Sequence, residues 1–321
     1  MEERQLSGDA GDGAKLTQHR EIRVVADATE LTRAAAEEVV AALARRSAPA
    51  SGERPAPAGG EQSVPAGDEQ SALSSPATAA VPAPFPTVAL SGGSTPRALY
   101  RLLADPAAPY RGRIDWPAIH FFWGDERHVP PDHPDSNFRM AREAMLDHVP
   151  VPAAHVNRIA GEEPEAALAA RRYERELIDL FHLRADRDDQ DGAASAPSPA
   201  MRPDWPRFDL VLLGLGQEGH TASLFPGSPL LAAAHATRHL AAAVWVAPLA
   251  TWRITLTPPV LNHAATVIFL VSGEAKAAAL AAVLEGEAQP ALYPARVVAP
   301  VDGRLLWLVD RAAAARLRSR R

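Results

Sequence analysis

A glycine-rich stretch at residues 214–228, GLGQEGHTASLFPGS, contains residue types that could bind a phosphate or perform acid–base chemistry. It follows the apolar run FDLVLL, and its first six residues fit the G-x-G-x-x-G pattern of dinucleotide-binding loops. Such a loop should begin a long helix and be followed, about twenty residues later, by an acidic residue for the ribose. Here Pro226-Gly227 interrupts any helix, and no acidic residue lies between Glu218 and Glu274. The pattern therefore argues against a dinucleotide cofactor.

His220 is the candidate general base in this stretch. A histidine side chain has an ordinary pKa of about 6.5, so it can take up and release a proton near neutral pH. Glu218 lies two residues before it and could orient the imidazole ring. A single histidine usually has a structural role, but a position at the end of a strand beside a carboxylate favours acid–base catalysis.

A second segment, LSGGSTPRALY, follows the predicted strand 87–91 and is suited to binding an anion. Gly92 and Gly93 permit a tight turn, and Ser94 and Thr95 are natural helix N-caps. A helix that begins in this way presents free N–H groups and the positive end of its dipole to a phosphate. The alternative is an ordinary connection between a strand and a helix.

A third segment, residues 123–138, crowds charged side chains into one loop. Arg127 could supply the planar set of donors that recognises phosphate, and Asp125 and Glu126 could orient it or act as acid–base groups. Three further residues could suggest a metal site: His128, Asp132 and His133. Their spacing matches no familiar ligand pattern, so the sequence predicts a solvated polar loop and no metal.

A fourth and weaker cluster is VSGEAKAAAL, in which Gly273 ends a predicted strand and Lys276 lies in the first turn of the next helix. A lysine at this place opposes the helix dipole. A bound anion near Lys276 would explain its presence.

The elements that must position these residues are short apolar strands alternating with helices. Strands are predicted at 21–27, 87–91, 118–124, 208–216, 242–247, 253–257, 266–272 and 305–310. Helices are predicted at 28–46 (with Thr29 as the N-cap), 96–104, 138–147, 162–182, 258–264, 273–285 and 310–318. This alternation predicts an α/β fold, a mostly parallel sheet with helices on both faces. Because ligands bind at the carboxyl ends of such strands, the polar clusters should lie together.

Two segments, 47–86 and 184–206, are rich in alanine and proline and have few large apolar side chains. They cannot bury enough surface to offset the entropy of ordering them. We predict that both are disordered insertions in surface loops, which can be lengthened at little thermodynamic cost. The chain is then a flexible N-terminus, 1–20, followed by a single domain, 21–321.

The composition limits the classes of function. The chain has 321 residues and no cysteine, which excludes disulfides, thiolate nucleophiles and cysteine-ligated zinc. Its net charge of −6 argues against nucleic acid as a partner. The N-terminal residues lack the apolar segment of a secretory signal, and the longest apolar run is too short to cross a membrane. We therefore expect a cytoplasmic protein that binds neither nucleic acid nor membrane.

Together the motifs resemble the 6-phosphogluconolactonase family, which is grouped with the glucosamine-6-phosphate deaminases/isomerases. The matching segments, in the order of the family, are LSGGSTPRALY, FFWGDERHVPPDHPDSNF, LVLLGLGQEGHTASLFPGS, WRITLTPPVLN and VSGEAK. The resemblance implies a Rossmann-like fold without a cofactor. It also implies hydrolysis of 6-phospho-D-glucono-1,5-lactone to 6-phosphogluconate in the pentose phosphate pathway. Separately, we expect a monomer.

The resemblance also implies roles for individual residues. His220 is expected to be the general base that activates water for attack on C1 of the lactone. The residues expected to contact the substrate and its phosphate are Gly92, Gly93, Ser94, Thr95, Asp125, Arg127 and Lys276. Glu218 is also expected to be catalytic, although the family most often has Asp-Gly-His where this chain has Glu218-Gly219-His220. Glutamate keeps the negative charge of that aspartate, and its side chain is longer by one methylene group.

Three other functions are alternatives on the same residues. Glucosamine-6-phosphate deamination on the same scaffold would call for F-N-M-D-E-Y and G-H-I-A-F-N-E-P, where this chain has FWGDER and GHTASLFP. A non-catalytic sugar-phosphate-binding regulator would keep the phosphate groups without needing His220. A nicotinamide-dependent oxidoreductase would need the missing acidic residue.

Overall fold

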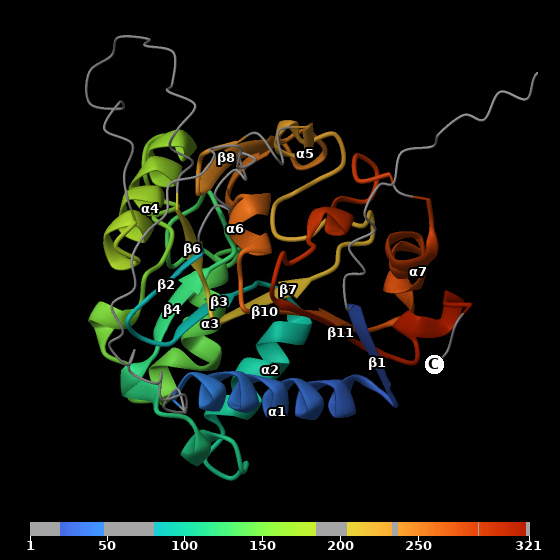
Figure 1. Ribbon diagram of the computed structural model, residues 1–321, viewed down its shortest axis with the longest axis horizontal. Coiled ribbons are helices and arrows are strands. Elements are labelled where there is room, and N and C mark those ends of the chain that lie inside the picture. The colour runs from blue at the N-terminus through green and yellow to red at the C-terminus, as the bar shows by residue number, and fades with distance from the viewer. Residues whose placement is uncertain (1–19, 48–79, 184–203, 233–236, 288, 319–321) are drawn as a thin grey trace, which may run out of the picture.

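The computed structural model describes residues 20–47, 80–183, 204–232, 237–287 and 289–318, and its centre is a six-stranded parallel sheet (Figure 1). The strand order is β1-β11-β10-β7-β3-β4. The strands are β1 (Arg20–Val25), β3 (Thr87–Leu90), β4 (His120–Trp123), β7 (Leu210–Gly214), β10 (Thr266–Val271) and β11 (Arg304–Asp310). Strand β10, TVIFLV, is buried at every position, as expected for a strand covered on both faces.

Helices cover the two faces of this sheet, which confirms the α/β fold. Helices α1 (Ala28–Ser47) and α2 (Ser94–Ala104) pack on one face, and α6 (Pro258–Asn262) lies on the other (Figure 1). The remaining helices are α3 (Asn137–Ala144), α4 (Ala166–Leu180), α5 (Pro229–Ala232) and α7 (Ala277–Glu285). Within the described ranges, none of these helices is long and apolar enough to span a membrane.

The beginning of α1 and the end of the chain differ from the prediction. Asp27, not Thr29, caps α1, because its carboxylate accepts hydrogen bonds from the amides of Thr29 (2.9 Å) and Glu30 (3.0 Å). The predicted helix 310–318 is only a 3₁₀ turn, Ala313–Arg316. The chain leaves helical geometry at Leu317, whose side chain is buried in the core.

A second sheet of three antiparallel strands, β5-β9-β8, adjoins the first. It contains β5 (Asp125–Arg127), β8 (Ala241–Val246) and β9 (Thr251–Leu256). Gly124 joins β4 to β5 and hydrogen-bonds to both sheets. Its amide donates to the carbonyl of Leu90 (2.8 Å), and its carbonyl accepts from the amide of Leu256 (2.8 Å). The chain therefore passes from the parallel into the antiparallel sheet at Gly124.

A third sheet lies at the margins of the predicted insertions. Strand β2 (Ala80–Pro82) pairs in parallel with β6 (Trp205–Arg207). Strand β2 lies within the predicted insertion 47–86, and β6 begins inside 184–206 and ends one residue beyond it, so ordered structure reaches into the margins of both segments. Val81 packs on the hydrophobic core and Trp205 is buried in it, which gives these residues the apolar contacts that stabilise a strand. Residues 48–79 and 184–203 lie outside the described part of the chain.

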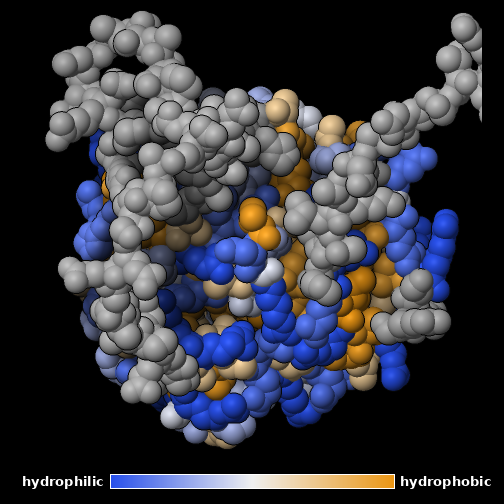
Figure 2. Space-filling model, viewed as in Figure 1, coloured by the Kyte–Doolittle hydropathy of each residue, from blue (hydrophilic) through white to orange (hydrophobic). Residues whose placement is uncertain are grey.

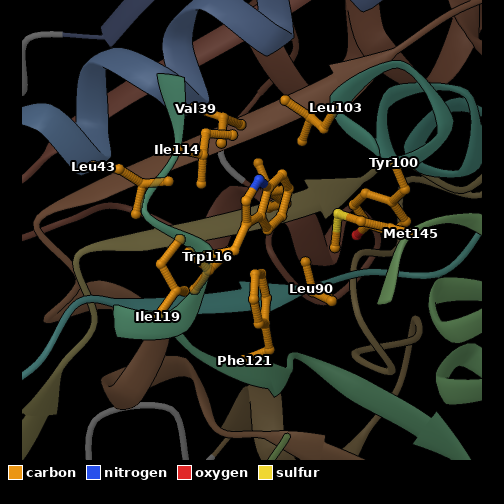
Figure 3. Close-up of a pocket in the computed structure, with 12 residues that line it drawn as sticks. Val39, Leu43, Leu90, Tyr100, Leu103, Ile114, Trp116, Ile119, Phe121 and Met145 are labelled. Carbon is orange, nitrogen blue, oxygen red and sulfur yellow. The ribbon is translucent and has the colours of Figure 1, made fainter. Parts of the chain in front are cut away.

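The core between α1, α2 and the sheet is well packed. Leu31, Ala35, Val39 and Leu43 follow the helical period of α1 and are buried against the sheet. Twelve residues, Trp116 and Met145 among them, enclose a cavity of about 10 Å³ (Figure 3). It is apolar and has room for no more than one water molecule, so it is a packing defect and not a ligand site.

Figure 2 shows hydrophilic residues over much of one outer face, with apolar residues gathered toward its centre right.

Candidate active site

A cleft of about 840 Å³ opens at the carboxyl ends of four adjacent strands: β10, β7, β3 and β4. The chain proceeds outward from β3 to β4 in one direction and from β7 through β10 to β11 in the other. The strand order therefore reverses between β3 and β7. This is the place where open α/β sheets bind their ligands.

The cleft brings together most of the residues singled out in the sequence. Those that line it are Gly92, Gly93, Asp125, Arg127, Glu218, His220 and Lys276. Ser94 and Thr95 begin α2 beside the cleft but are not among its lining residues. Neither of them caps the helix, because the N-cap position belongs to Gly93, whose φ of 109° favours glycine.

His220 lies in the loop after β7 with its imidazole ring held on several sides. Its Nδ1 is 3.0 Å from Oε2 of Glu218, and its ring stacks on Phe225 with centroids 4.0 Å apart. A Cβ atom added to Gly216 would lie 2.0 Å from Nδ1, so only glycine leaves space for the ring there. The side chain is 25% exposed. Within the described ranges Nε2 has no protein partner, which leaves this nitrogen available to a ligand.

The charges around His220 set its protonation state. Burial lowers the pKa of His220, while the carboxylates of Glu218 and Asp125 raise it and Lys276 lowers it. The hydrogen bond from its own backbone amide and the contact with His220 hold the pKa of Glu218 below its usual range. Burial also lowers the pKa of Lys276. His220 is consequently neutral at pH 7, with an ionised carboxylate on Nδ1.

Asp125 is fixed by two buried polar side chains. Its Oδ2 accepts a hydrogen bond from Oγ of Ser223 (2.6 Å), and its Oδ1 and backbone carbonyl accept from Nδ2 of Asn137 (3.2 and 2.9 Å). Asn137 in turn packs against Gly92, where an added Cβ would lie 1.9 Å from Oδ1 of Asn137. These contacts join the ends of β3 and β4 to the loop of His220.

Glu126 has a structural role and does not face the cleft. Side chains alternate along a strand, so Asp125 and Arg127 share one face of β5 and Glu126 lies on the other. Its buried carboxylate accepts hydrogen bonds from the amides of Asn137 (2.7 Å) and Phe138 (2.8 Å) at the start of α3. Burial raises the pKa of Glu126, and these hydrogen bonds oppose that rise. The suggested acid–base role of Glu126 therefore finds no support.

Arg127 faces a second arginine that the sequence analysis did not select. Arg127 and Arg253 are directly opposite each other in the antiparallel pair β5–β9, and both line the cleft. Within the described ranges the Nε atoms of both are buried without a hydrogen-bond partner. Burial and the charge of Arg127 lower the pKa of Arg253. Like charges opposite each other are unfavourable, so the pair is suited to an anion that binds between them.

The three residues suggested for a metal make other contacts or lie in the polar loop. Nε2 of His128 is 2.7 Å from the carbonyl of Glu163, and His133 contacts Asp135. The carbonyl of Asp132 accepts a hydrogen bond from Arg139 (2.7 Å). Across the described residues no group of three or more His, Asp or Glu side chains is placed to hold a metal ion.

The family model that matches residues 72–307 describes glucosamine-6-phosphate isomerases and 6-phosphogluconolactonase. The chain belongs to this family. It is 41% identical to the 6-phosphogluconolactonase of Synechocystis sp. over 232 residues, which are 72% of this chain and 85% of the relative. It is 42% identical to that of Nostoc sp. over 231 residues, 72% and 84% of the two chains. The 6-phosphogluconolactonase structure from Trypanosoma cruzi matches with a TM-score of 0.65 at 27% identity and covers 95% of this chain and 99% of its own.

Sequence reasoning missed Arg253, Asn137 and Ser223 as site residues. The segment WRITLT carried a partial signal, because Arg253 and Thr255 alternate with Trp252, Ile254 and Leu256 along a strand. Its pairing with Arg127 depends on the register between two strands more than one hundred residues apart, which the sequence does not contain. Asn137 and Ser223 are common residue types in ordinary loops, and only their contacts with Asp125 identify them as site residues.

Proposed function

We propose that the protein hydrolyses 6-phospho-D-glucono-1,5-lactone to 6-phosphogluconate. One observation carries the proposal: His220, paired with Glu218, shares a single cleft with Arg127, Arg253 and Lys276. A neutral imidazole can activate water for attack on an ester, and the cationic side chains can bind a phosphate in the same molecule. The names of the relatives support this reaction within the family.

His220 serves as general base and then as general acid. Its Nε2 takes a proton from the water that attacks C1 of the lactone, and the hydrogen bond at Nδ1 with Glu218 stabilises the imidazolium that results. The imidazolium then donates its proton to the ring oxygen as the tetrahedral intermediate collapses. Glu218 thus orients the ring and balances its positive charge, and the longer side chain of glutamate still reaches Nδ1.

Arg127 and Arg253 bind the phosphate, and Lys276, which follows the neighbouring strand β10, lines the same cleft. The phosphate is remote from C1, so its binding energy positions the reacting carbon over Nε2. Asp125, an acceptor held by Ser223 and Asn137, is placed to accept a hydrogen bond from a sugar hydroxyl group. The backbone of Gly92 and Gly93 completes the wall of the cleft on the side of β3.

A coupled assay with freshly generated 6-phosphogluconolactone tests the proposal against the spontaneous rate. General base catalysis contributes about 10²- to 10⁴-fold, so His220→Ala should lower kcat by that factor and leave binding of 6-phosphogluconate nearly unchanged. His148→Ala, at an exposed histidine that does not line the cleft, is the matched control. Unchanged turnover in His220→Ala would exclude His220 as the general base. Release of ammonia from glucosamine 6-phosphate, without lactone hydrolysis, would assign the other reaction of the family.

A further inference from the structure

A tight turn brings Phe225 back over the imidazole of His220. The amide of Leu224 donates to the carbonyl of Thr221 (2.9 Å), and Ala222 adopts a left-handed conformation with φ of 47°. The hydroxyl of Thr221 donates to the carbonyl of Gly214 (2.8 Å) and so anchors the turn to the end of β7. The position of the Phe225 ring is therefore set by the sheet and not by an independent loop.

We propose that Phe225 is a positioning residue for the general base: its ring fixes the plane of the His220 imidazole and excludes water from one side. The proposal rests on the proposed function. The rings are 4.0 Å apart and inclined by 23°, which is a stacked arrangement. Gly216 restricts the ring further, since its amide donates to the carbonyl of His220 (2.8 Å) and its Cα lies close to the ring. Rotation of the imidazole would break this stack and the contact with Glu218.

The stack has a second effect, on the proton affinity of His220. Three charged groups act on this ring: Glu218 and Asp125, which favour the imidazolium, and Lys276, which opposes it. Burial outweighs the carboxylates and lowers the pKa of His220. Loss of the Phe225 ring admits water to the imidazole, so the pKa of His220 rises toward its ordinary value of about 6.5. The acidic limb of the pH–rate profile then moves to higher pH.

Phe225→Leu tests the proposal, because it removes the ring and keeps an apolar side chain. Misplacement of a catalytic group by a fraction of an ångström to 1 Å costs about 10- to 100-fold in rate, so kcat should fall by that factor while KM stays nearly constant. The acidic limb of the pH–rate profile should shift to higher pH. The titration midpoint of the His220 imidazole, measured by NMR in the absence of substrate, should shift in the same direction. Phe225→Tyr should restore most of kcat. Leu168→Ala removes an exposed apolar side chain on α4 that does not line the cleft, and it should change neither measurement.

A wild-type kcat and an unshifted titration in Phe225→Leu would overturn the proposal. If Phe225→Leu does not fold, Phe225→Met provides the same test, because it also removes the ring and keeps an apolar side chain. A wild-type kcat in that variant would also overturn it. The NMR titration does not depend on turnover, so it tests the role of Phe225 separately from the proposed function. Absence of lactone hydrolysis in the wild-type protein would refute the proposed function, while an upward shift of the titration in Phe225→Leu would still show that the ring controls His220.

Discussion

Arg253 illustrates how a single residue acquires a role from its neighbour across a strand pair. Alone it is a half-buried arginine in β9. Because it lies opposite Arg127, the two guanidinium groups form a site with two positive charges. Its buried Nε has no partner among the residues that the structure describes, so the guanidinium retains donors for a phosphate. The nearby carboxylate of Asp125 offsets part of the positive charge.

At this scale we predict that Arg253→Ala weakens binding of 6-phosphogluconate by about 10- to 100-fold, because hydrogen bonds to charged groups contribute about 1.5–3 kcal/mol. Calorimetric titration of the wild type and variant measures the effect, and Arg253→Lys should recover only part of it, since an ammonium group lacks the bidentate geometry. Arg207→Ala, at an arginine paired with Asp302 outside the cleft, is the control. Wild-type affinity in Arg253→Ala would exclude this residue from the phosphate site.

The elements that build the site meet where β4 continues into β5. At Gly124 the chain leaves the parallel sheet, and the alternation of β5 then directs Asp125 and Arg127 into the cleft and Glu126 into the start of α3. Helix α3 returns Asn137 to Asp125, and Asn137 fills the space beside Gly92. The end of β3 and the start of α3 are therefore packed as one unit.

For these elements we predict that Gly92→Ala displaces Asn137, because the new Cβ would lie 1.9 Å from its Oδ1. Overpacking of this kind costs about 1–3 kcal/mol in the free energy of unfolding. Activity should fall as well, since Asp125 loses a hydrogen-bond donor. Urea unfolding and the lactone assay measure both effects. Gly112→Ala has free space around its Cβ and should leave both unchanged; equal stability of Gly92→Ala and the wild type would contradict the packing argument.

On the scale of the whole molecule, the two ends of the central sheet have different chemistry. The carboxyl ends of the strands bear the charged cleft, whereas the amino end of β4 bears a stack of rings. His120, the first residue of β4, stacks between Phe85 (3.6 Å) and His155 (3.9 Å). Burial and then the proximity of His155 lower the pKa of His120 to about 4.

This stack predicts that the protein loses stability in mild acid, independently of the cleft. The unfolded chain binds a proton at His120 below a pH of about 6.5, whereas the folded protein does so only near pH 4. Stability is therefore lost as the pH falls from about 6.5 toward 4. His120→Phe keeps a stacked ring and removes this titration, so its Tm relative to the wild type should be higher at pH 5 than at pH 7.5. An equal difference at both values would contradict the prediction.

Much of the fold and the site follows from local sequence. The apolar runs predict all six strands of the central sheet, since a strand buried on both faces needs apolar side chains throughout. The polar residues that follow those runs predict a common cleft, because the carboxyl ends of parallel strands lie at one edge of the sheet. His220, Asp125, Arg127 and Lys276 were found in this way, and all line the cleft.

Other features were decided only by the tertiary structure. The strands β2 and β6 form because two distant segments pair beside a buried tryptophan, and local composition alone predicts disorder there. Arg253 faces the cleft because of a strand register, and Phe225 covers His220 because of a turn anchored on β7. The sequence by itself determines which residue types are available and which segments are apolar. Which side chains touch depends on pairing and packing over long sequence separations, and these determine the surroundings of His220.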